Sequence, residues 1–122
     1  MNIPLNTIII YARDMKKTAD FYSRFFGFET SGEVVEGLIE LRAPAGGAGI
    51  LIHQAAKSVK LGQVGVKLVF AVQDIEAFKK NSVELGLVFG STHQAKAYSF
   101  ANTKDPDKNT VAISSRAFRS QG

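Results

Sequence analysis

The sequence contains no cysteine and no tryptophan, and it has only two histidines. Without cysteine the chain can form no disulfide, no thiolate metal site and no cysteine nucleophile. No apolar run approaches the roughly 20 residues that a membrane helix needs. The first residues, MNIPLN, lack the charged start and the long apolar stretch of a secretion signal. We therefore expect a cytoplasmic protein without membrane contact.

Acidic residues are also in the minority. The 15 Lys and Arg residues outnumber the 11 Asp and Glu residues, which gives a net charge of +4. The basic residues are scattered, for example at Lys16, Lys57, Lys79, Lys104 and Arg119. Proteins that bind nucleic acids usually gather such residues on one stripe with aromatic residues between them. The scattered charge predicts a solvated surface and no nucleic-acid partner.

Apolar residues, by contrast, are plentiful. The 122 residues are 45% hydrophobic and include nine Phe, which is enough for a packed interior and too apolar for disorder. This length corresponds to one domain, or to two half-size modules that share a core.

The segment 7–29 is repeated further along the chain. In both copies an apolar run ends at an aspartate, Asp14 or Asp74, a helical segment follows, and a glycine, Gly27 or Gly86, closes it. An aspartate can accept backbone N–H bonds where a helix begins, and a glycine supplies the left-handed residue that commonly ends one. A repeat of this length indicates a supersecondary unit that is used twice.

Hydrophobic periodicity and turn residues predict the order βαβββ for each unit. In the first, we expect strands at 5–11, 33–35, 38–42 and 49–53, with a helix between Asp14 and Gly27. In the second, we expect strands at 66–72, 87–90, 97–101 and 110–114, with a helix at 75–85. Residues 1–54 then form the first module, 55–65 a linker, and 66–116 the second module.

Three short motifs accompany the duplication. They are Tyr-Ala-Arg-Asp at 11–14, Phe-Tyr at 21–22 with Phe-Gly at 26–27 closing the helix, and Asp-Pro-Asp-Lys-Asn at 105–109, a turn whose side chains can bond its own backbone. With these residues the chain resembles the vicinal-oxygen-chelate superfamily, which includes glyoxalase I, bleomycin-resistance proteins, fosfomycin-resistance enzymes and extradiol dioxygenases. The resemblance covers nearly the whole chain, although Lys108 stands where most members have glycine. It implies an α+β fold in which two βαβββ modules form a curved mixed sheet, or cup, with the helices outside.

The resemblance also implies up to four metal ligands on the floor of the cup. The corresponding positions here are Thr7, Lys67, Leu51 and Ala112. Leucine and alanine have no donor atom, a lysine ammonium has no lone pair, and a single threonine hydroxyl is a weak ligand. A divalent metal needs several imidazole or carboxylate ligands. We therefore expect the fold of the family without its metal, and no other cofactor.

A metal site rebuilt from other residues is an alternative. Strand alternation puts His53 on the same face as Leu51, with Glu40 on the neighbouring strand, whereas His93 falls in a polar loop. The two histidines have no matched spacing. A hydrogen-bonded or solvated role is the favoured interpretation for both.

Alternation also predicts which residues line the cup. The predicted ligand-binding residues are Thr7, Ile9, Tyr11, Leu51, His53, Lys67, Val69, Ala112 and Ser114. An apolar hollow with a few hydroxyls, an imidazole and an ammonium suits a small, partly apolar ligand. Lys67 either meets an anionic or carbonyl-bearing ligand, or bonds an internal partner or extends to the rim. The sequence slightly favours the internal role.

Three classes of function follow. The first is a metal-independent binding protein that sequesters a small molecule, as in the bleomycin-resistance branch, whose grooves lie between two subunits, so we expect a homodimer. The second is a glyoxalase- or dioxygenase-like lyase or transferase that uses Lys67, His53 or a rebuilt metal site. The third is an interaction domain with a vestigial cup. The lost metal positions favour the first class, and the net charge of +4 favours an anionic or neutral aromatic ligand over a bulky cation. No catalytic residue is assigned, and whether the modules pair within one chain or between two stays open.

Overall fold

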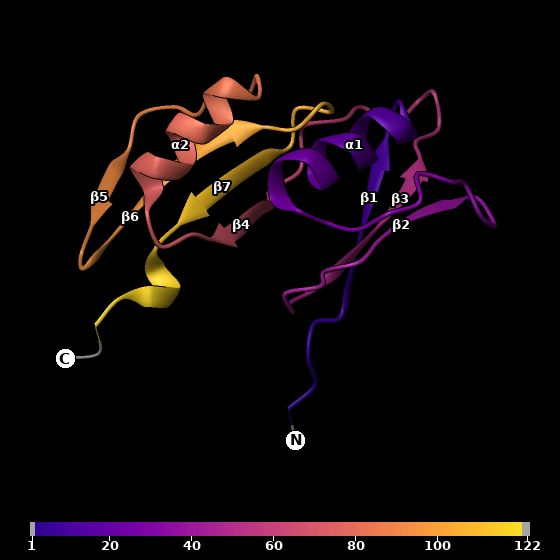
Figure 1. The fold of residues 1–122 in the computed structure, drawn as a ribbon. Coiled ribbons are helices and arrows are strands. Elements are labelled where there is room, and N and C mark those ends of the chain that lie inside the picture. Colours follow the sequence, from indigo (N-terminus) through magenta and orange to yellow (C-terminus); the bar gives the residue numbers. More distant parts are fainter. Residues whose placement is uncertain (1, 121–122) are drawn as a thin grey trace. The chain divides into compact units, whose positions relative to one another are not determined.

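A computed structural model describes residues 2–120 of the chain (Figure 1). The chain divides into two compact units, Met1–Leu61 and Gly62–Gly122, called unit 1 and unit 2 below. Unit 1 contains β1 (Thr7–Ala12), α1 (Met15–Phe26), β2 (Leu38–Leu41) and β3 (Gly49–Gln54). Unit 2 contains β4 (Lys67–Ala71), α2 (Ile75–Glu84), β5 (His93–Ala95), β6 (Tyr98–Lys104), β7 (Thr110–Ser114) and the 3-10 helix η1 (Arg116–Phe118). The predicted α+β fold of two modules is confirmed.

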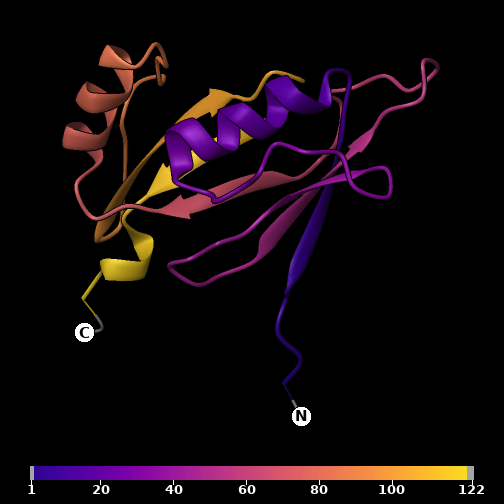
Figure 2. The same cartoon turned by 45° about the vertical axis from the view of Figure 1, so that its right-hand side comes forward.

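The sheet of unit 1 has three strands in the order β1-β3-β2. β1 runs parallel to β3, and β2 runs antiparallel to it. α1 packs across all three strands with its buried residues Thr18, Ala19, Phe21 and Tyr22. The residues before β1 extend away from this sheet in both ribbon views (Figures 1 and 2).

The core of unit 1 lies between α1 and one face of this sheet. Its strand residues are every second one: Ile10, Ala12, Ile39, Leu41, Ile50 and Ile52, all at most 7% exposed. Successive strand residues point to opposite faces, so this alternation leaves the intervening residues on the face turned away from the helix.

The sheet of unit 2 has four strands in the order β4-β7-β6-β5. Only the β4–β7 pair is parallel. β7 is central and almost fully buried, and α2 contacts β6. η1 follows β7 as the short yellow coil near the C-terminus in Figure 2. Its Arg116 guanidinium carbon lies 5.9 Å from the centre of the Tyr98 ring.

Both helices begin as the sequence predicts. The side chain of Asp14 accepts from Lys17 N at 3.1 Å, and that of Asp74 accepts from Ala77 N at 3.0 Å. Each carboxylate thereby satisfies an N–H group that has no partner within its helix. At the end of α1, Gly27 adopts the left-handed conformation with φ 77°, as predicted.

The turn at 105–109 also bonds its own backbone, as predicted. Oδ1 of Asp105 accepts from the backbone N–H groups of Asp107 and Asn109, both at 2.9 Å. Its Oδ2 accepts from Nδ2 of Asn109 at 3.0 Å. Lys108 has a left-handed φ of 67°, a conformation that glycine adopts without cost and a lysine does not. The turn positions the start of β7.

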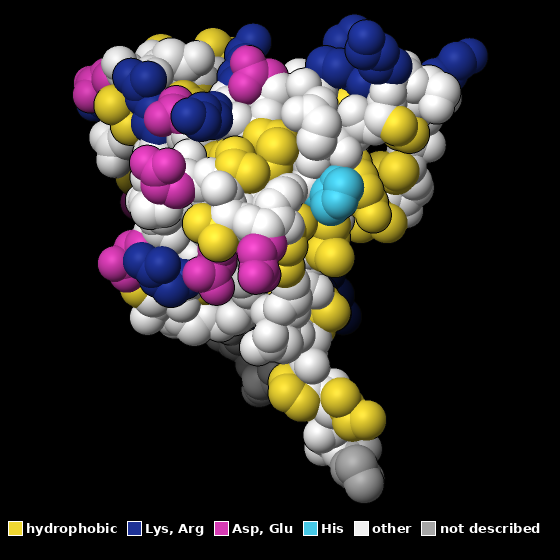
Figure 3. Space-filling model, turned by 90° about the vertical axis from the view of Figure 1, so that its right-hand side faces the viewer, with side chains coloured by type: hydrophobic (Ala, Val, Ile, Leu, Met, Phe, Trp, Pro, Cys, Tyr) yellow, Lys and Arg dark blue, Asp and Glu magenta, His cyan; other side chains and the backbone are white. Residues whose placement is uncertain are grey.

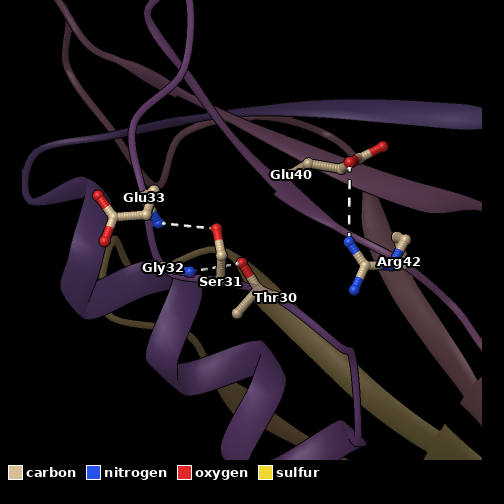
Figure 4. Close-up of polar contacts among 6 residues, drawn as sticks. All are labelled: Thr30, Ser31, Gly32, Glu33, Glu40 and Arg42. Carbon is tan, nitrogen blue, oxygen red and sulfur yellow. Dashed lines mark hydrogen bonds and ion pairs between the residues drawn. The ribbon is translucent and has the colours of Figure 1, made fainter.

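The predicted strand at 33–35 is wrong. Two side-chain hydroxyls accept hydrogen bonds from the backbone at its start. Gly32 N donates to Thr30 Oγ1, and Glu33 N donates to Ser31 Oγ, each at 3.1 Å (Figure 4). Such side-chain bonds compete with a strand ladder. Only Val35 pairs, with Leu38, across a tight turn with two positive φ angles.

The predicted strand at 87–90 is wrong as well. Leu87 and Phe89 are buried, so the predicted alternation of buried and exposed residues is present. However, Leu87 N donates to Ser82 O at the end of α2, and the hydroxyl of Thr103 donates to Val88 O. One backbone bond to β6 is present, from Gly90 N to Asn102 O at 2.8 Å, but it does not extend into a strand ladder. The second strand of unit 2 is instead β5, which places His93 on a strand and not in a loop.

Candidate functional site

The face of each sheet turned away from its helix is called the open face. In unit 1 it carries the strand residues that alternate with the core: Thr7, Ile9, Tyr11, Leu38, Glu40, Leu51 and His53. Ile9 and Tyr11 are each 51% exposed, which is unusual for large apolar side chains in the middle of a strand. One side of the molecule shows hydrophobic side chains gathered beside a histidine (Figure 3).

Tyr11 and His53 lie side by side near the end of β1 and β3 on this face. They are opposite each other in the β1–β3 register, and their ring centroids are 5.1 Å apart. Nδ1 of His53 lies 2.8 Å from the carbonyl oxygen of Gln54. Because a carbonyl oxygen can only accept, this bond requires a proton on Nδ1. In the neutral imidazole, Nε2 is then the atom that can accept a hydrogen bond or a proton from a ligand.

Glu40 does not pair with His53. In the β2–β3 register Glu40 lies opposite Leu51, and its carboxylate forms an ion pair with Arg42 at 3.9 Å (Figure 4). Leu38 is the β2 residue opposite His53. Within residues 2–120, no group of three or more His, Asp or Glu side chains is placed to hold a metal ion.

Two hollows accompany these elements, one in each unit. The hollow in unit 1 has a volume of about 240 Å³ and lies beside Thr7, whose hydroxyl donates to Asn6 Oδ1 at 2.7 Å. The hollow in unit 2, of about 720 Å³, lies at the start of α2 and is bordered by Glu76 and Thr92. Its polar groups already bond one another, since the Thr92 hydroxyl donates to Glu76 and accepts from Lys79.

The open face of unit 2 is made by strand residues in three cross-strand rows. The register gives the rows Lys67–Thr110–Lys104, Val69–Ala112–Asn102 and Ala71–Ser114–Phe100–His93. Four of the predicted ligand-binding residues, Lys67, Val69, Ala112 and Ser114, therefore share one face. Lys67 and Val69 are exposed, whereas Ala112 and Ser114 are 1% and 5% exposed.

Lys67 reaches across the sheet. Its Nζ donates to Oδ1 of Asn102 at 3.1 Å and lies 5.4 Å from the centre of the Phe100 ring. Both partners are on β6, and β7 separates β6 from β4. The Lys67 side chain therefore crosses β7 between Thr110 and Ala112. The partner that the structure shows for the Lys67 ammonium is a side-chain amide of unit 2.

Lys104 is the second ammonium on this face. Its Nζ donates to the hydroxyl of Thr110 at 2.7 Å. Among residues 2–120, neither Lys67 nor Lys104 forms an ion pair. The four strands of this sheet contain no Asp or Glu at all. The open face of unit 2 thus carries cations whose partners are neutral.

Sequence reasoning missed Asn102, Phe100 and Lys104 as site residues. The predicted strand ended at 101, so Asn102 and Lys104 fell outside it, and Phe100 within it was not assigned to a face. In the structure β6 continues because Thr103 and Lys104 pair with Val111 and Thr110. The alternation of Phe100, Asn102 and Lys104 was the available signal.

Comparisons with known proteins agree with this architecture. The family model of the Glyoxalase/Bleomycin resistance protein/Dioxygenase superfamily matches residues 5–113. The chain belongs to this superfamily. A comparison with curated protein sequences gave no match.

Three solved structures share this fold. TnmS3, an antibiotic binding protein from Streptomyces sp. CB03234, has a TM-score of 0.74 and 16% identity, with 93% of this chain and 94% of that chain covered. The oxidase ChaP-H2 has a TM-score of 0.75 and 21% identity, with 95% of each chain covered. Lactoylglutathione lyase from Agrobacterium tumefaciens has a TM-score of 0.69 and 20% identity, covering 89% of this chain and 90% of that one. At such identities the likeness shows the fold.

The four positions at which the resemblance predicts metal ligands do not offer a ligand set that fits a metal. Leu51 and Ala112 offer no ligand atom, and the ammonium of Lys67 donates to Asn102. The hydroxyl of Thr7 donates to Asn6. The four side chains therefore provide no set of imidazole or carboxylate ligands.

None of the helices in the described part of the chain is long and apolar enough to cross a membrane.

Proposed function

We propose that the protein binds a small anionic or aromatic molecule without a metal, and that the open face of unit 2 is the principal binding surface. The observation that carries the proposal is the state of Lys67. This residue stands at a metal-ligand position of the superfamily, and its ammonium donates to Asn102 beside the Phe100 ring. The Lys67 ammonium, which is itself a cation, therefore stands where the resemblance predicts a ligand for a metal cation.

The charges around Lys67 favour an anion. An ammonium has three donors, and the structure shows one of them in use, at Asn102. No acidic residue occurs in the four strands of this sheet. The net charge of +4 acts in the same direction over longer range. TnmS3, which has the same fold, is an antibiotic binding protein, and this supports a binding function for the chain.

Metal analysis of the purified protein tests the proposal. The protein is prepared without chelators, its metal content is measured, and its melting temperature is followed with added zinc, nickel, manganese or iron. We expect metal far below one equivalent and no rise in melting temperature when metal is added. A metal that bound the folded protein would stabilise it and raise the melting temperature. A full equivalent of metal together with a clear rise would overturn metal independence.

A screen of anionic aromatic compounds then tests the binding role, with Lys67→Ala as the matched variant. We expect the wild-type protein to bind members of this class and the variant to bind them more weakly. Binding that does not change in the variant would place the ligand away from Lys67.

An enzyme is the second candidate, and His53 is the observation that favours it. Its Nδ1–H is held by the Gln54 carbonyl, which leaves Nε2 as the acceptor on an exposed ring beside Tyr11. A histidine held in this way has the arrangement of a general base. Turnover of an added substrate that disappears in His53→Gln, while binding persists, would establish this candidate over the first.

We also propose that the protein forms a homodimer. Ile9, Tyr11 and Val69 are each more than half exposed on the open faces, and exposed apolar surface of this kind marks interaction sites. The molar mass in solution, measured by light scattering after gel filtration, tests this proposal. A monomer at all accessible concentrations would contradict it.

A further inference from the structure

The open face of unit 2 carries two ammonium groups in one row of the sheet. Lys67 and Lys104 stand on either side of Thr110, on β4 and β6. Lys104 Nζ donates to the Thr110 hydroxyl, while Lys67 Nζ donates to Asn102 Oδ1 in the next row. Both groups are thereby held on the same face of the sheet, at neighbouring rows, by bonds that leave further N–H donors on each.

Neither of these two ammonium groups is paired with a carboxylate among residues 2–120. The bonds shown for them go to neutral oxygens, and within residues 2–120 no carboxylate lies within ion-pair distance of either. Two like charges near one another repel, and an anion placed between them removes that repulsion. The pair is therefore suited to bind one oxyanion from two sides.

Aromatic rings adjoin the ammonium pair. The Phe100 ring is 5.1 Å from the ring of His93, with an angle of 30° between their planes. Tyr98 continues the series, 6.4 Å from Phe100. These residues extend along β6 and β5 away from the lysines. Flat apolar groups attract other flat rings through offset stacking.

We infer that the ligand is an aromatic carboxylate, whose anion lies between Lys67 and Lys104 and whose ring packs beside Phe100. The inference rests on the proposed function and deepens it, because it names the chemical class and adds Lys104 and Phe100 to the site. Each part of the ligand has its own protein partner. The charge and the ring are therefore separable in an experiment.

The test uses two probes of the same shape, 2-naphthoate and its neutral counterpart 2-naphthamide, with binding to the full chain measured by titration calorimetry. We expect the wild-type protein to bind 2-naphthoate about tenfold or more tightly than 2-naphthamide, since bonds to charged groups exceed neutral ones. Lys67→Met and Lys104→Met keep the apolar stem and remove the charge. Each should abolish most of the preference for the anion while 2-naphthamide binding stays unchanged.

Two further variants separate the contributions. Lys80→Met removes an exposed lysine of α2 and should leave both affinities at the wild-type value, which controls for net charge. Phe100→Leu should weaken the binding of both probes by the same factor, because it removes the aromatic ring beside which the ring of either probe packs. Equal affinity of the wild-type protein for both probes, or equal effects of Lys104→Met and Lys80→Met, would overturn the inference.

The outcomes also separate this inference from the proposed function. If 2-naphthamide binds as well as 2-naphthoate, the anion site fails, but a metal-independent binding protein remains. If neither probe binds, the inference is overturned. The proposed function fails with it only if the protein also contains a full equivalent of metal.

Discussion

Nζ of Lys67 lies 3.1 Å from Oδ1 of Asn102, although the strands that carry them are separated by β7. The lysine stem therefore extends over the central strand, where the small side chain of Ala112 leaves room for it. The residue at position 102 therefore decides whether the positive charge of Lys67 is compensated. Asn102 leaves the charge of the ammonium uncompensated.

Asn102→Asp should strongly reduce binding of anionic aromatic ligands. The new carboxylate would form an ion pair with Lys67 and compete with the ligand for the ammonium. The melting temperature should stay close to the wild-type value, because exposed ion pairs contribute only about 0–1 kcal/mol. Calorimetric titration with 2-naphthoate and a thermal melt measure the two effects. Asn102→Leu serves as the control for loss of the amide alone, and equal affinity in the two variants would contradict the prediction.

Asp14→Ala and Asp74→Ala should each lower the free energy of unfolding by about 1 kcal/mol, because each removes the acceptor of an N-terminal helix N–H. Urea unfolding followed by circular dichroism measures the change. Asp20→Ala, at an exposed position within α1, is the matched control and should be neutral or slightly stabilising, since alanine favours helix. A cap variant as stable as the control would refute the capping role.

Gly62→Ala should destabilise the protein by about 2 kcal/mol, because a Cβ meets packed atoms and the backbone is left-handed. A Cβ at Gly62 would lie 2.8 Å from the Cβ of Lys108 and 3.0 Å from Asp107 O, at a φ of 76°. Lys108→Gly alone should stabilise by up to about 1 kcal/mol, since it relieves a left-handed lysine. Combining the two should recover part of the Gly62→Ala loss. Strict additivity in urea unfolding would show that the two positions do not interact.

Arg13→Gln should loosen the segment that follows β3. The guanidinium donates to Ala56 O at 3.0 Å and to Val59 O at 2.6 Å, which fixes this segment to the end of β1. Without these bonds, trypsin should cleave faster after Lys57 and Lys60, because cleavage requires local opening.

The cleavage rate of the Arg13→Gln variant is compared with that of Arg24→Gln, which also removes one surface arginine. Mass spectrometry of the early fragments identifies the cleavage sites. Equal rates in the two variants would show that the Arg13 bonds do not hold the segment.

His53 should be observed as the Nδ1–H tautomer when it is neutral, because the Gln54 carbonyl requires a proton on that nitrogen. Long-range proton–nitrogen NMR distinguishes the two ring nitrogens, and His93→Gln assigns the signals. A ligand that donates to Nε2 should shift that nitrogen and leave Nδ1 in place. A neutral His53 protonated on Nε2 would contradict both the bond and the acid–base candidate.

Local physical chemistry made much of the fold predictable. Asp14 and Asp74 are helix caps, Gly27 ends a helix, and Asp105 organises its turn, and each of these roles depends on atoms only a few residues away. The duplication gave the module order, because the same local pattern occurs twice. Prediction failed where side chains compete with a strand for backbone hydrogen bonds. The hydroxyls of Thr30 and Ser31 took backbone donors before the expected strand at 33–35.

The sequence by itself determined the superfamily fold and the absence of imidazole and carboxylate groups at Thr7, Leu51, Lys67 and Ala112, because residue type alone decides which ligand atoms a side chain offers. Tertiary structure decided where the Lys67 ammonium goes. Its partners Asn102 and Phe100 lie far along the chain, and the pairing of β6 with β7 sets which of their neighbours face the same side. The partnership of Lys104 with Thr110 depends on the same register. Strand register is a property of the assembled sheet, and the charge pattern of this face therefore becomes visible only in the folded unit.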